Sequence, residues 1–402
     1  MAATVDSFQI GLGQNLCEVL WKDEHVSRFH AKWLRFNCRC VKCYSEVAAT
    51  YLIDVPSFPL DMKIATVKVE DSTFKVSFAG DDHVSILPSD WLRSKCYCDV
   101  CLELKLQKAD VITQYIESNA GKKKEIPQME YEDILTKEGM FNWIGHVITS
   151  GVCIVRNVQP TPEKLEEIAE RVANIEETTY GKLSVVKISS TEGNAAYSNI
   201  KLPFHQDQTM YEKPPGIEFL HCMKFDECIT GGETKIVDLY EVINILKRES
   251  PADFQTLVEV PVIYSTIDYK RTNKVYLHHQ KHVVVLDYFG KVVAINWHPA
   301  LLSTLQVREK DVERYYEAHV KLLQIIRRDE LHFTHRMQPG DLVVFNNRRV
   351  LHSRNKFEAN GGDRQLQTTY ASADNWKNRY MTLAHQLNRN VVAPKIGNGS
   401  SI

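Results

Sequence analysis

The spacing of apolar and polar residues predicts β-strands near the start of the chain and a mixture of strands and helices farther on. Residues 73–78 alternate apolar and polar side chains, as a half-buried strand does. One apolar stripe predicts a helix, because its members recur every three or four positions: Val312, Tyr316, Val320, Leu323 and Ile326. The chain therefore combines both kinds of element.

From about residue 130 onward, short apolar runs predict buried strands that stand between helices. We expect one helix to begin at Asp133 and another to run from Pro162 to about Ala173, with proline at its first position. The predicted strands are residues 151–156, 235–238, 282–286 and 341–345. This order favours a mainly β fold with helices (α+β), in which helices buttress a jelly-roll barrel.

Composition narrows the class of protein. The chain has 402 residues, of which 44% are hydrophobic and 25% are charged, as in soluble globular proteins. A formal net charge of −2 gives no electrostatic reason to expect nucleic-acid binding. No apolar run approaches the roughly 20 residues of a membrane span. Because the first residues also lack the pattern of a secretory signal, we expect a cytoplasmic enzyme.

Six of the ten cysteines stand in two triads with the same spacing. Residues 23–43 align with residues 81–101 at a constant offset of 58, so they look like one unit written twice. The aligned positions include Trp-Leu-Arg, Asp-x-His and both Cys-x-Cys-x2-Cys triads, namely Cys38, Cys40, Cys43 and Cys96, Cys98, Cys101.

Three thiolates and one imidazole make a closed tetrahedral zinc site, which stabilises a small domain. Each half of the repeat offers three cysteines and one histidine, so two zinc sites are conceivable. The alternative for the second triad is a set of buried free thiols. We expect residues 1–115 to form a small β-rich zinc-binding domain, residues 116–130 a polar linker, and residues 131–402 the barrel.

The barrel region carries two imidazoles and one carboxylate in the pattern of a mononuclear non-haem iron site. His205 and Asp207 form a His-x-Asp pair, and His352 follows 147 residues after His205. Such a set holds one face of Fe(II) and leaves the other face open for a cosubstrate and oxygen. Arg364, 12 residues beyond His352, suits a bidentate pair with a carboxylate held over the metal.

These motifs together resemble those of the Fe(II)- and 2-oxoglutarate-dependent oxygenases. Within that class the chain is similar to the gamma-butyrobetaine dioxygenase and trimethyllysine dioxygenase family, from about residue 21 to about residue 385. The resemblance implies a double-stranded β-helix (jelly roll) behind a small zinc domain, in a homodimer. The segments that carry it are residues 33–43, 205–207, 214–222, 231–234 and 349–352.

The resemblance also implies roles for individual residues. His205, Asp207 and His352 would bind Fe(II), while Arg364, assisted by Thr234, would hold the distal carboxylate of 2-oxoglutarate. Ascorbate is implied as a reductant. The zinc ligands would be Cys38, Cys40, Cys43 and His83, so that the histidine comes from the other half of the repeat. By the same logic, a mirrored second site would use Cys96, Cys98, Cys101 and His25.

Substrate recognition in this family uses an aromatic cage around a trimethylammonium group, held by cation–π interactions. The matching positions are Tyr180, Tyr197 and Tyr370, while Asn194 matches the residue that meets the substrate carboxylate. The alternative is that these tyrosines are core or strand residues. Three positions depart from the family pattern: Ser184 replaces a cage tryptophan, Gln208 replaces a tyrosine, and His298 with Pro299 replaces a pair of asparagines.

The expected function is hydroxylation of gamma-butyrobetaine to L-carnitine with O2, giving succinate and CO2 as coproducts. Trimethyllysine, or another small carboxylate or trimethylammonium compound, is the alternative substrate, because the three departures alter the substrate pocket. An alternative of another class is a zinc-module interaction protein with an inactive barrel. The sequence therefore defines the catalytic class better than it defines the substrate.

Overall fold

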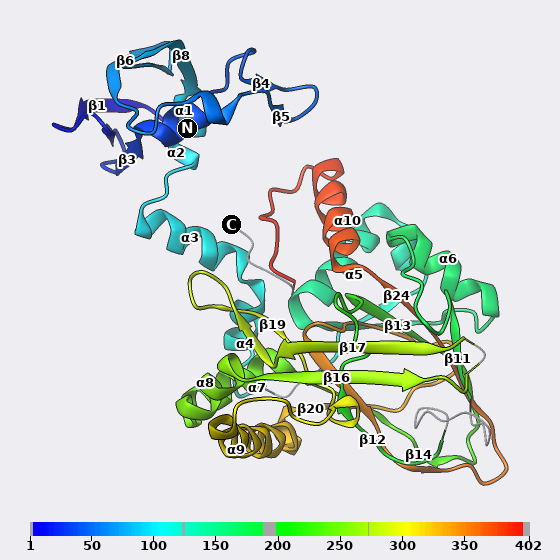
Figure 1. Cartoon of the computed structure of the whole chain (residues 1–402). Helices are drawn as coiled ribbons and strands as arrows, with labels where there is room; N and C mark the ends of the chain where they lie inside the picture. The colour runs from blue at the N-terminus through cyan, green and yellow to red at the C-terminus, as the bar shows by residue number, and fades with distance from the viewer. Residues whose placement is uncertain (1–2, 123–124, 188–197, 272, 397–402) are drawn as a thin grey trace. The chain divides into compact units, whose positions relative to one another are not determined.

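The protein forms two compact units in a computed structural model, which describes residues 3–122, 125–187, 198–271 and 273–396 (Figure 1). The division between the units falls between Gln107 and Lys108. None of the helices formed by the described residues combines the length and the apolar character that crossing a membrane requires.

The first unit contains one small motif twice, a three-stranded antiparallel sheet followed by a short helix. The first copy consists of β1 (Val5–Ile10), β2 (Leu16–Trp21), β3 (Val26–His30) and α1 (Ala31–Phe36). The second copy consists of β6 (Ile64–Glu70), β7 (Thr73–Phe78), β8 (Asp81–Pro88) and α2 (Ser89–Ser94). Strand β7 confirms the prediction for residues 73–78. The remaining elements are β4 (Tyr44–Ser45), β5 (Thr50–Tyr51), the 3-10 helix η1 (Val55–Ser57) and α3 (Asp99–Ala109).

One hydrophobic core joins the two copies of the motif. Phe29 from the first copy and Phe74 from the second belong to the same cluster of buried side chains. Trp33 and Trp91, which are equivalent positions of the repeat, have ring centroids 5.7 Å apart. Because neither three-stranded sheet could bury its apolar face alone, the two copies fold as one unit.

The second unit is a double-stranded β-helix, as the sequence predicted. Its larger sheet has the order β11 (Ser184–Lys187), β24 (Arg364–Ala371), β13 (Ile217–Phe225), β21 (Leu342–Asn346), β10 (Val152–Arg156) and β9 (Gln128–Glu130). The smaller sheet has the order β12 (Leu202–His205), β22 (Val350–Arg354), β15 (Thr234–Asp238) and β20 (His332–His335). The described residues also form two-stranded antiparallel sheets. These pair β14 (Thr230–Gly231) with β23 (Phe357–Glu358), β16 (Pro261–Asp268) with β17 (Val275–His282), and β18 (Val284–Leu286) with β19 (Val292–Ile295).

Two groups of helices pack against these sheets. One group shares a core with the larger sheet and comprises α5 (Lys137–Ser150), α6 (Pro162–Val172) and α10 (Ala373–Gln386). The other group shares a core with β15 to β19 and comprises α7 (Leu239–Glu249), α8 (Pro251–Glu259) and α9 (Glu309–Ile326). The remaining helices are α4 (Val111–Ser118), η2 (Asp133–Leu135), η4 (Pro299–Leu301) and η5 (Asp329–Leu331).

Three local predictions need correction. The helix expected from Asp133 begins as a 3-10 turn, and α5 starts only after Thr136, whose side chain accepts a hydrogen bond from the Gly139 N–H. The strand expected at residues 282–286 is divided at Val283 between β17 and β18. Helix α9 is present, but the predicted stripe is only partly buried, because Tyr316 and Val320 are about half exposed whereas Ile326 is buried. Its buried residues are Tyr315, Ala318, Leu322, Ile325 and Ile326, which meet the core that α7 and α8 also bury.

Candidate active site

The three predicted iron ligands come together where β12 and β22 pair. His205 ends β12 and lies directly opposite His352 of β22, with the two ring centroids 4.2 Å apart. Asp207 follows in the next turn, and its Oδ1 lies 3.3 Å from His205 Nε2 and 3.9 Å from His352 Nε2. The three ligand atoms all lie within 4.8 Å of one another.

This spacing fits one metal ion. Neighbouring ligands that each lie about 2.1 Å from an octahedral ion are about 3 Å apart, close to the separation of Asp207 from His205 and about 1 Å less than that of Asp207 from His352. The Nδ1 of His205 lies 2.7 Å from the carbonyl oxygen of Pro203. Because a carbonyl only accepts, Nδ1 is the protonated nitrogen, and Nε2 presents its lone pair toward the other two ligands.

Buried hydrogen bonds fix the turn that carries the carboxylate. The Asp207 N–H donates to Asn347 Oδ1 at 2.8 Å, and Asn347 Nδ2 donates back to the Asp207 carbonyl at 2.9 Å. The side chain of Gln206 donates to the Asn347 carbonyl and accepts from the Trp297 N–H. Asn347 lies in the turn between β21 and β22, and no role was predicted for this residue from the sequence.

Tyr370 makes a contact that the sequence did not predict. Its hydroxyl donates to Asp207 Oδ2 at 2.5 Å, while Oδ1 faces the two histidines. Burial disfavours a charge on Asp207, but its contacts with the two imidazoles and the hydrogen bond from Tyr370 together hold the pKa of this carboxyl below the usual range. Burial and the neighbouring His205 lower the pKa of His352 to about 3, so this imidazole is neutral, as metal binding requires.

Arg364 begins β24 and is a buried cation. Only 5% of the residue is exposed, and its Nε meets no hydrogen-bond partner among the described residues. The rings of Phe225 and Phe357 flank the guanidinium, at 5.3 Å and 5.7 Å. Burial lowers the pKa of Arg364 to about 10. A buried guanidinium without a carboxylate is costly, so this environment suits an anionic ligand.

Thr234 and Arg354 lie on the same face as His352. In the register between β15 and β22, Thr234 is opposite Arg354, and both are buried. Side chains two residues apart on a strand share a face and are separated by about 7 Å. Thr234 and Arg354 therefore lie about one strand repeat away from His352 on the same face.

The described residues among the predicted substrate contacts are not arranged as a simple aromatic cage. The ring of Tyr180 already faces the guanidinium of Arg271, at 4.6 Å. Tyr197 and Asn194 lie outside the described residues. Ser184 is on β11, opposite Thr368, and Gln208 is buried in a left-handed conformation with φ of 57°.

Two further ionisable side chains, His298 and Glu218, lie close to the predicted iron ligands. The ring of His298 lies 4.8 Å from that of His205, and burial together with His205 holds the pKa of His298 well below its usual value. Glu218 on β13 lies directly opposite Tyr370 on β24 and is 2% exposed. Burial and the charge of Asp207 raise the pKa of Glu218 well above its usual value. The sequence analysis assigned Glu218 no role.

The predicted zinc ligands also converge, in the first unit. The Nε2 of His83 lies 3.3 Å, 3.5 Å and 3.4 Å from the sulfur atoms of Cys38, Cys40 and Cys43. Among the described residues, all the cysteines are free thiols. Three sulfurs and one imidazole nitrogen at these separations form the donor set of a closed zinc site.

Comparisons with known proteins identify the family of this chain. Residues 114–370 match the family described as "Taurine catabolism dioxygenase TauD, TfdA family", and residues 12–83 match "Gamma-butyrobetaine hydroxylase-like, N-terminal". Human gamma-butyrobetaine dioxygenase is 29% identical over 378 residues, which cover 93% of this chain and 96% of the relative. Bos taurus mitochondrial trimethyllysine dioxygenase is 30% identical over 369 residues, which cover 90% of this chain and 84% of the relative. A solved taurine dioxygenase from Burkholderia xenovorans aligns with a TM-score of 0.46 and 15% identity, over 62% of this chain and 88% of that one.

Proposed function

Because this chain belongs to the TauD, TfdA family, it is a 2-oxoglutarate-dependent dioxygenase, and we propose that it hydroxylates gamma-butyrobetaine to L-carnitine. In this reaction one oxygen atom of O2 enters a C–H bond of the substrate to form the hydroxyl group. The other oxygen atom enters 2-oxoglutarate, which loses CO2 and becomes succinate. The two electrons from the substrate and the two from 2-oxoglutarate together reduce O2.

The proposed iron ligands are His205, Asp207 and His352, supported by the convergence of their donor atoms. Fe(II) with 2-oxoglutarate would supply the oxidising chemistry that attacks an unactivated C–H bond. The protein's task is to hold three ligands on one face, orient the target carbon, and exclude water. Tyr370 serves this task by fixing the Asp207 carboxylate, and Asn347 by fixing the turn that carries it.

The proposed 2-oxoglutarate contacts are Arg364 and Thr234. The supporting observation for Arg364 is its burial without a hydrogen-bond partner for Nε among the described residues. A carboxylate placed there would gain a charge-assisted hydrogen bond that the protein itself does not provide. Thr234 supports the same role through its place on the face that carries His352.

A cationic substrate is favoured by the buried carboxyl of Glu218. This residue faces the same side as Tyr370, whose hydroxyl contacts Asp207. A trimethylammonium group nearby would stabilise the ionised form of this carboxyl, which burial and Asp207 otherwise disfavour. Trimethyllysine remains the second candidate, because the bovine trimethyllysine dioxygenase matches as closely as the human gamma-butyrobetaine dioxygenase.

Several cofactors, contacts and properties of the protein stay predictions. They are structural zinc at Cys38, Cys40, Cys43 and His83, ascorbate as a reductant, a homodimer, a cytoplasmic location, and the cage role of Tyr180, Tyr197 and Tyr370 with Asn194 at the substrate carboxylate.

Succinate release distinguishes the candidate substrates. The purified chain is incubated with Fe(II), 2-oxoglutarate and O2, with gamma-butyrobetaine, trimethyllysine or no added substrate. The proposal predicts that gamma-butyrobetaine stimulates succinate release most strongly and is hydroxylated. Stimulation by trimethyllysine alone would contradict the proposed substrate and leave the dioxygenase class unchanged. An inactive barrel, as in an interaction protein, would bind neither Fe(II) nor 2-oxoglutarate in the absence of oxygen.

A further inference from the structure

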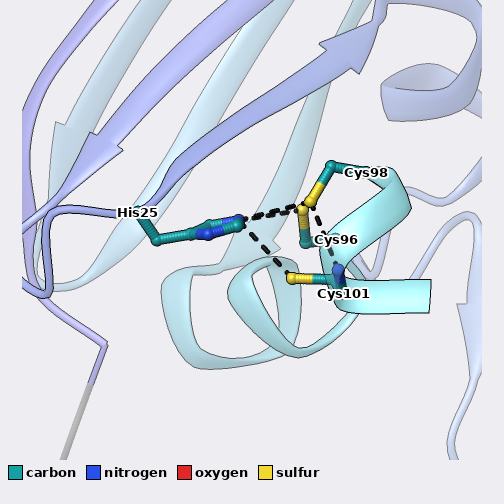
Figure 2. A group of neighbouring side chains, drawn as sticks. All are labelled: His25, Cys96, Cys98 and Cys101. Atoms are coloured by element: carbon teal, nitrogen blue, oxygen red, sulfur yellow. Dashed lines mark hydrogen bonds between the residues drawn. The ribbon is translucent and has the colours of Figure 1, made fainter. Parts of the chain in front are cut away.

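The second cysteine triad and His25 form a four-residue cluster in the first unit. His25 lies in the turn between β2 and β3, while the three cysteines lie between α2 and the first turns of α3. The Nε2 of His25 is 3.3 Å from the sulfur of Cys96, 3.7 Å from that of Cys98 and 3.5 Å from that of Cys101. Figure 2 shows the imidazole pointing at all three sulfur atoms.

Hydrogen bonding alone does not account for this convergence. The Nε2 atom of an imidazole carries either one hydrogen or one lone pair, so it can make one good hydrogen bond and not three. A tetrahedral zinc ion with Zn–S of about 2.3 Å and Zn–N of about 2.0 Å would separate nitrogen from each sulfur by about 3.5 Å. The three measured distances lie within a few tenths of an ångström of that value. We propose that His25, Cys96, Cys98 and Cys101 bind a second structural zinc ion.

The first cluster provides an internal comparison. His83 meets Cys38, Cys40 and Cys43 at 3.3 Å, 3.5 Å and 3.4 Å, which is the same arrangement at the equivalent positions of the repeat. In each cluster the histidine comes from one half of the repeat and the cysteines from the other half. Each ion would therefore link the two halves of the repeat. One site would take its histidine from the second half, and the other site would take its histidine from the first half.

The residues that support the ligands are also duplicated. In the first cluster Asp81 accepts from the His83 N–H at 2.9 Å and from Arg35 Nε at 2.5 Å. Arg35 also donates to the sulfur of Cys43 at 3.6 Å.

The second cluster repeats each of these bonds. Asp23 accepts from the His25 N–H at 3.2 Å and from Arg93 Nη2 at 2.9 Å. Arg93 donates to the sulfur of Cys101 at 3.5 Å. Three cysteines that were only relics of a duplication would not need this aspartate and arginine, because free buried thiols pack as small apolar groups.

Neither matched family segment covers the second triad. Residues 96–101 fall between the segment that matches the N-terminal family, residues 12–83, and the segment that matches the dioxygenase family, residues 114–370. Four protein ligands leave no open position on the ion, so the role of this zinc would be structural. The inference stands apart from the catalytic proposal, because it concerns the first unit alone.

Zinc counting on the full-length chain tests this second site. The protein is treated with EDTA to clear open sites, and the zinc released by a mercurial thiol reagent is then measured per chain. We expect two zinc ions in the wild type and one in Cys98→Ser. Cys228→Ser, which changes an exposed cysteine outside both triads, is the matched control and should keep two. One zinc in the wild type with no loss in Cys98→Ser would overturn the proposal.

Cobalt substitution gives a second measurement that needs no variant. Co(II) bound by thiolates absorbs strongly through sulfur-to-metal charge transfer. When cobalt is added to the full-length apoprotein, this absorption should rise linearly until two equivalents are bound, with six thiolates engaged. Saturation at one equivalent would overturn the second site even if Cys98→Ser failed to fold.

Discussion

The hydroxyl of Tyr370 donates a 2.5 Å hydrogen bond to the outer oxygen of the Asp207 carboxylate, across 163 residues of sequence. This bond leaves Oδ1 as the oxygen that faces His205 and His352. A group that orients a metal ligand in this way typically affects metal affinity or activity by about 10- to 100-fold. Tyr370 would therefore be a positioning residue for the proposed iron site, a role that experiment can separate from the predicted cage role.

Replacing Tyr370 with phenylalanine removes the hydroxyl and keeps the aromatic ring. We expect the Kd for Fe(II) to rise by about 10-fold or more, because the Asp207 carboxylate loses its fixed orientation. The KM for the cationic substrate should change little, since a phenyl ring still offers cation–π contact. Anaerobic Fe(II) titration and steady-state kinetics measure the two quantities. An unchanged Fe(II) affinity with a raised substrate KM would assign Tyr370 to the cage instead.

Replacing Arg364 with methionine tests the 2-oxoglutarate site. Truncating one partner of a buried charge pair costs about 2 to 4 kcal/mol, so the KM for 2-oxoglutarate should rise by about 30- to 1000-fold. Arg389→Met is a matched control, because Arg389 forms an exposed ion pair with Glu138 and should leave this KM unchanged. A similar KM in the Arg364 variant and the wild type would show that another residue binds the carboxylate.

Replacing Glu218 with glutamine keeps the shape of the side chain and removes its ability to ionise beside a bound cation. If a trimethylammonium group lies near this carboxyl, the substrate KM should rise by about 10-fold, while the slow turnover of 2-oxoglutarate without substrate stays the same. Steady-state kinetics with gamma-butyrobetaine checks the first point and succinate release without substrate checks the second. A substrate KM equal to that of the wild type would place the cation elsewhere.

Lys281 should make stability depend on pH. Its Nζ donates to the Tyr211 carbonyl at 2.7 Å, and burial lowers its pKa from 10.5 to about 7. Between these pH values the unfolded chain binds a proton at Lys281 that the folded chain does not, so this residue's contribution to the free energy of unfolding rises with pH. Relative to Lys281→Met, the wild type should gain about 1 to 3 kcal/mol between pH 7 and pH 10. Urea unfolding at both pH values measures the difference, which would stay constant if Lys281 titrated normally.

The sequence predicted those features that depend on local pattern. His205 and Asp207 are two positions apart in one motif. The alternation of side chains in β7 is visible in six consecutive residues. The repeat offset likewise placed His25 and His83 at equivalent positions. Periodicity also predicted helix α9, because apolar residues recur along it.

The features that the sequence did not predict depend on contacts between elements that are distant in the chain. The bond between Tyr370 and Asp207 requires the register of β24, and the role of Asn347 requires the turn between two sheets. The buried face of α9 was predicted one residue away from the real one, because α7 and α8 determine which side is covered. Glu218 gave no signal at all, since a glutamate in a strand is ordinarily expected to face solvent.

The central claim is that His205, Asp207 and His352 form the iron site of a gamma-butyrobetaine hydroxylase. The most direct measurement is mass spectrometry of the products after turnover of the wild type with Fe(II), 2-oxoglutarate, gamma-butyrobetaine and ¹⁸O2. The account predicts one labelled oxygen in the hydroxylated betaine, one in an equimolar amount of succinate, and neither product with His352→Ala. Succinate formation that gamma-butyrobetaine does not stimulate, with no labelled hydroxyl product, would contradict it.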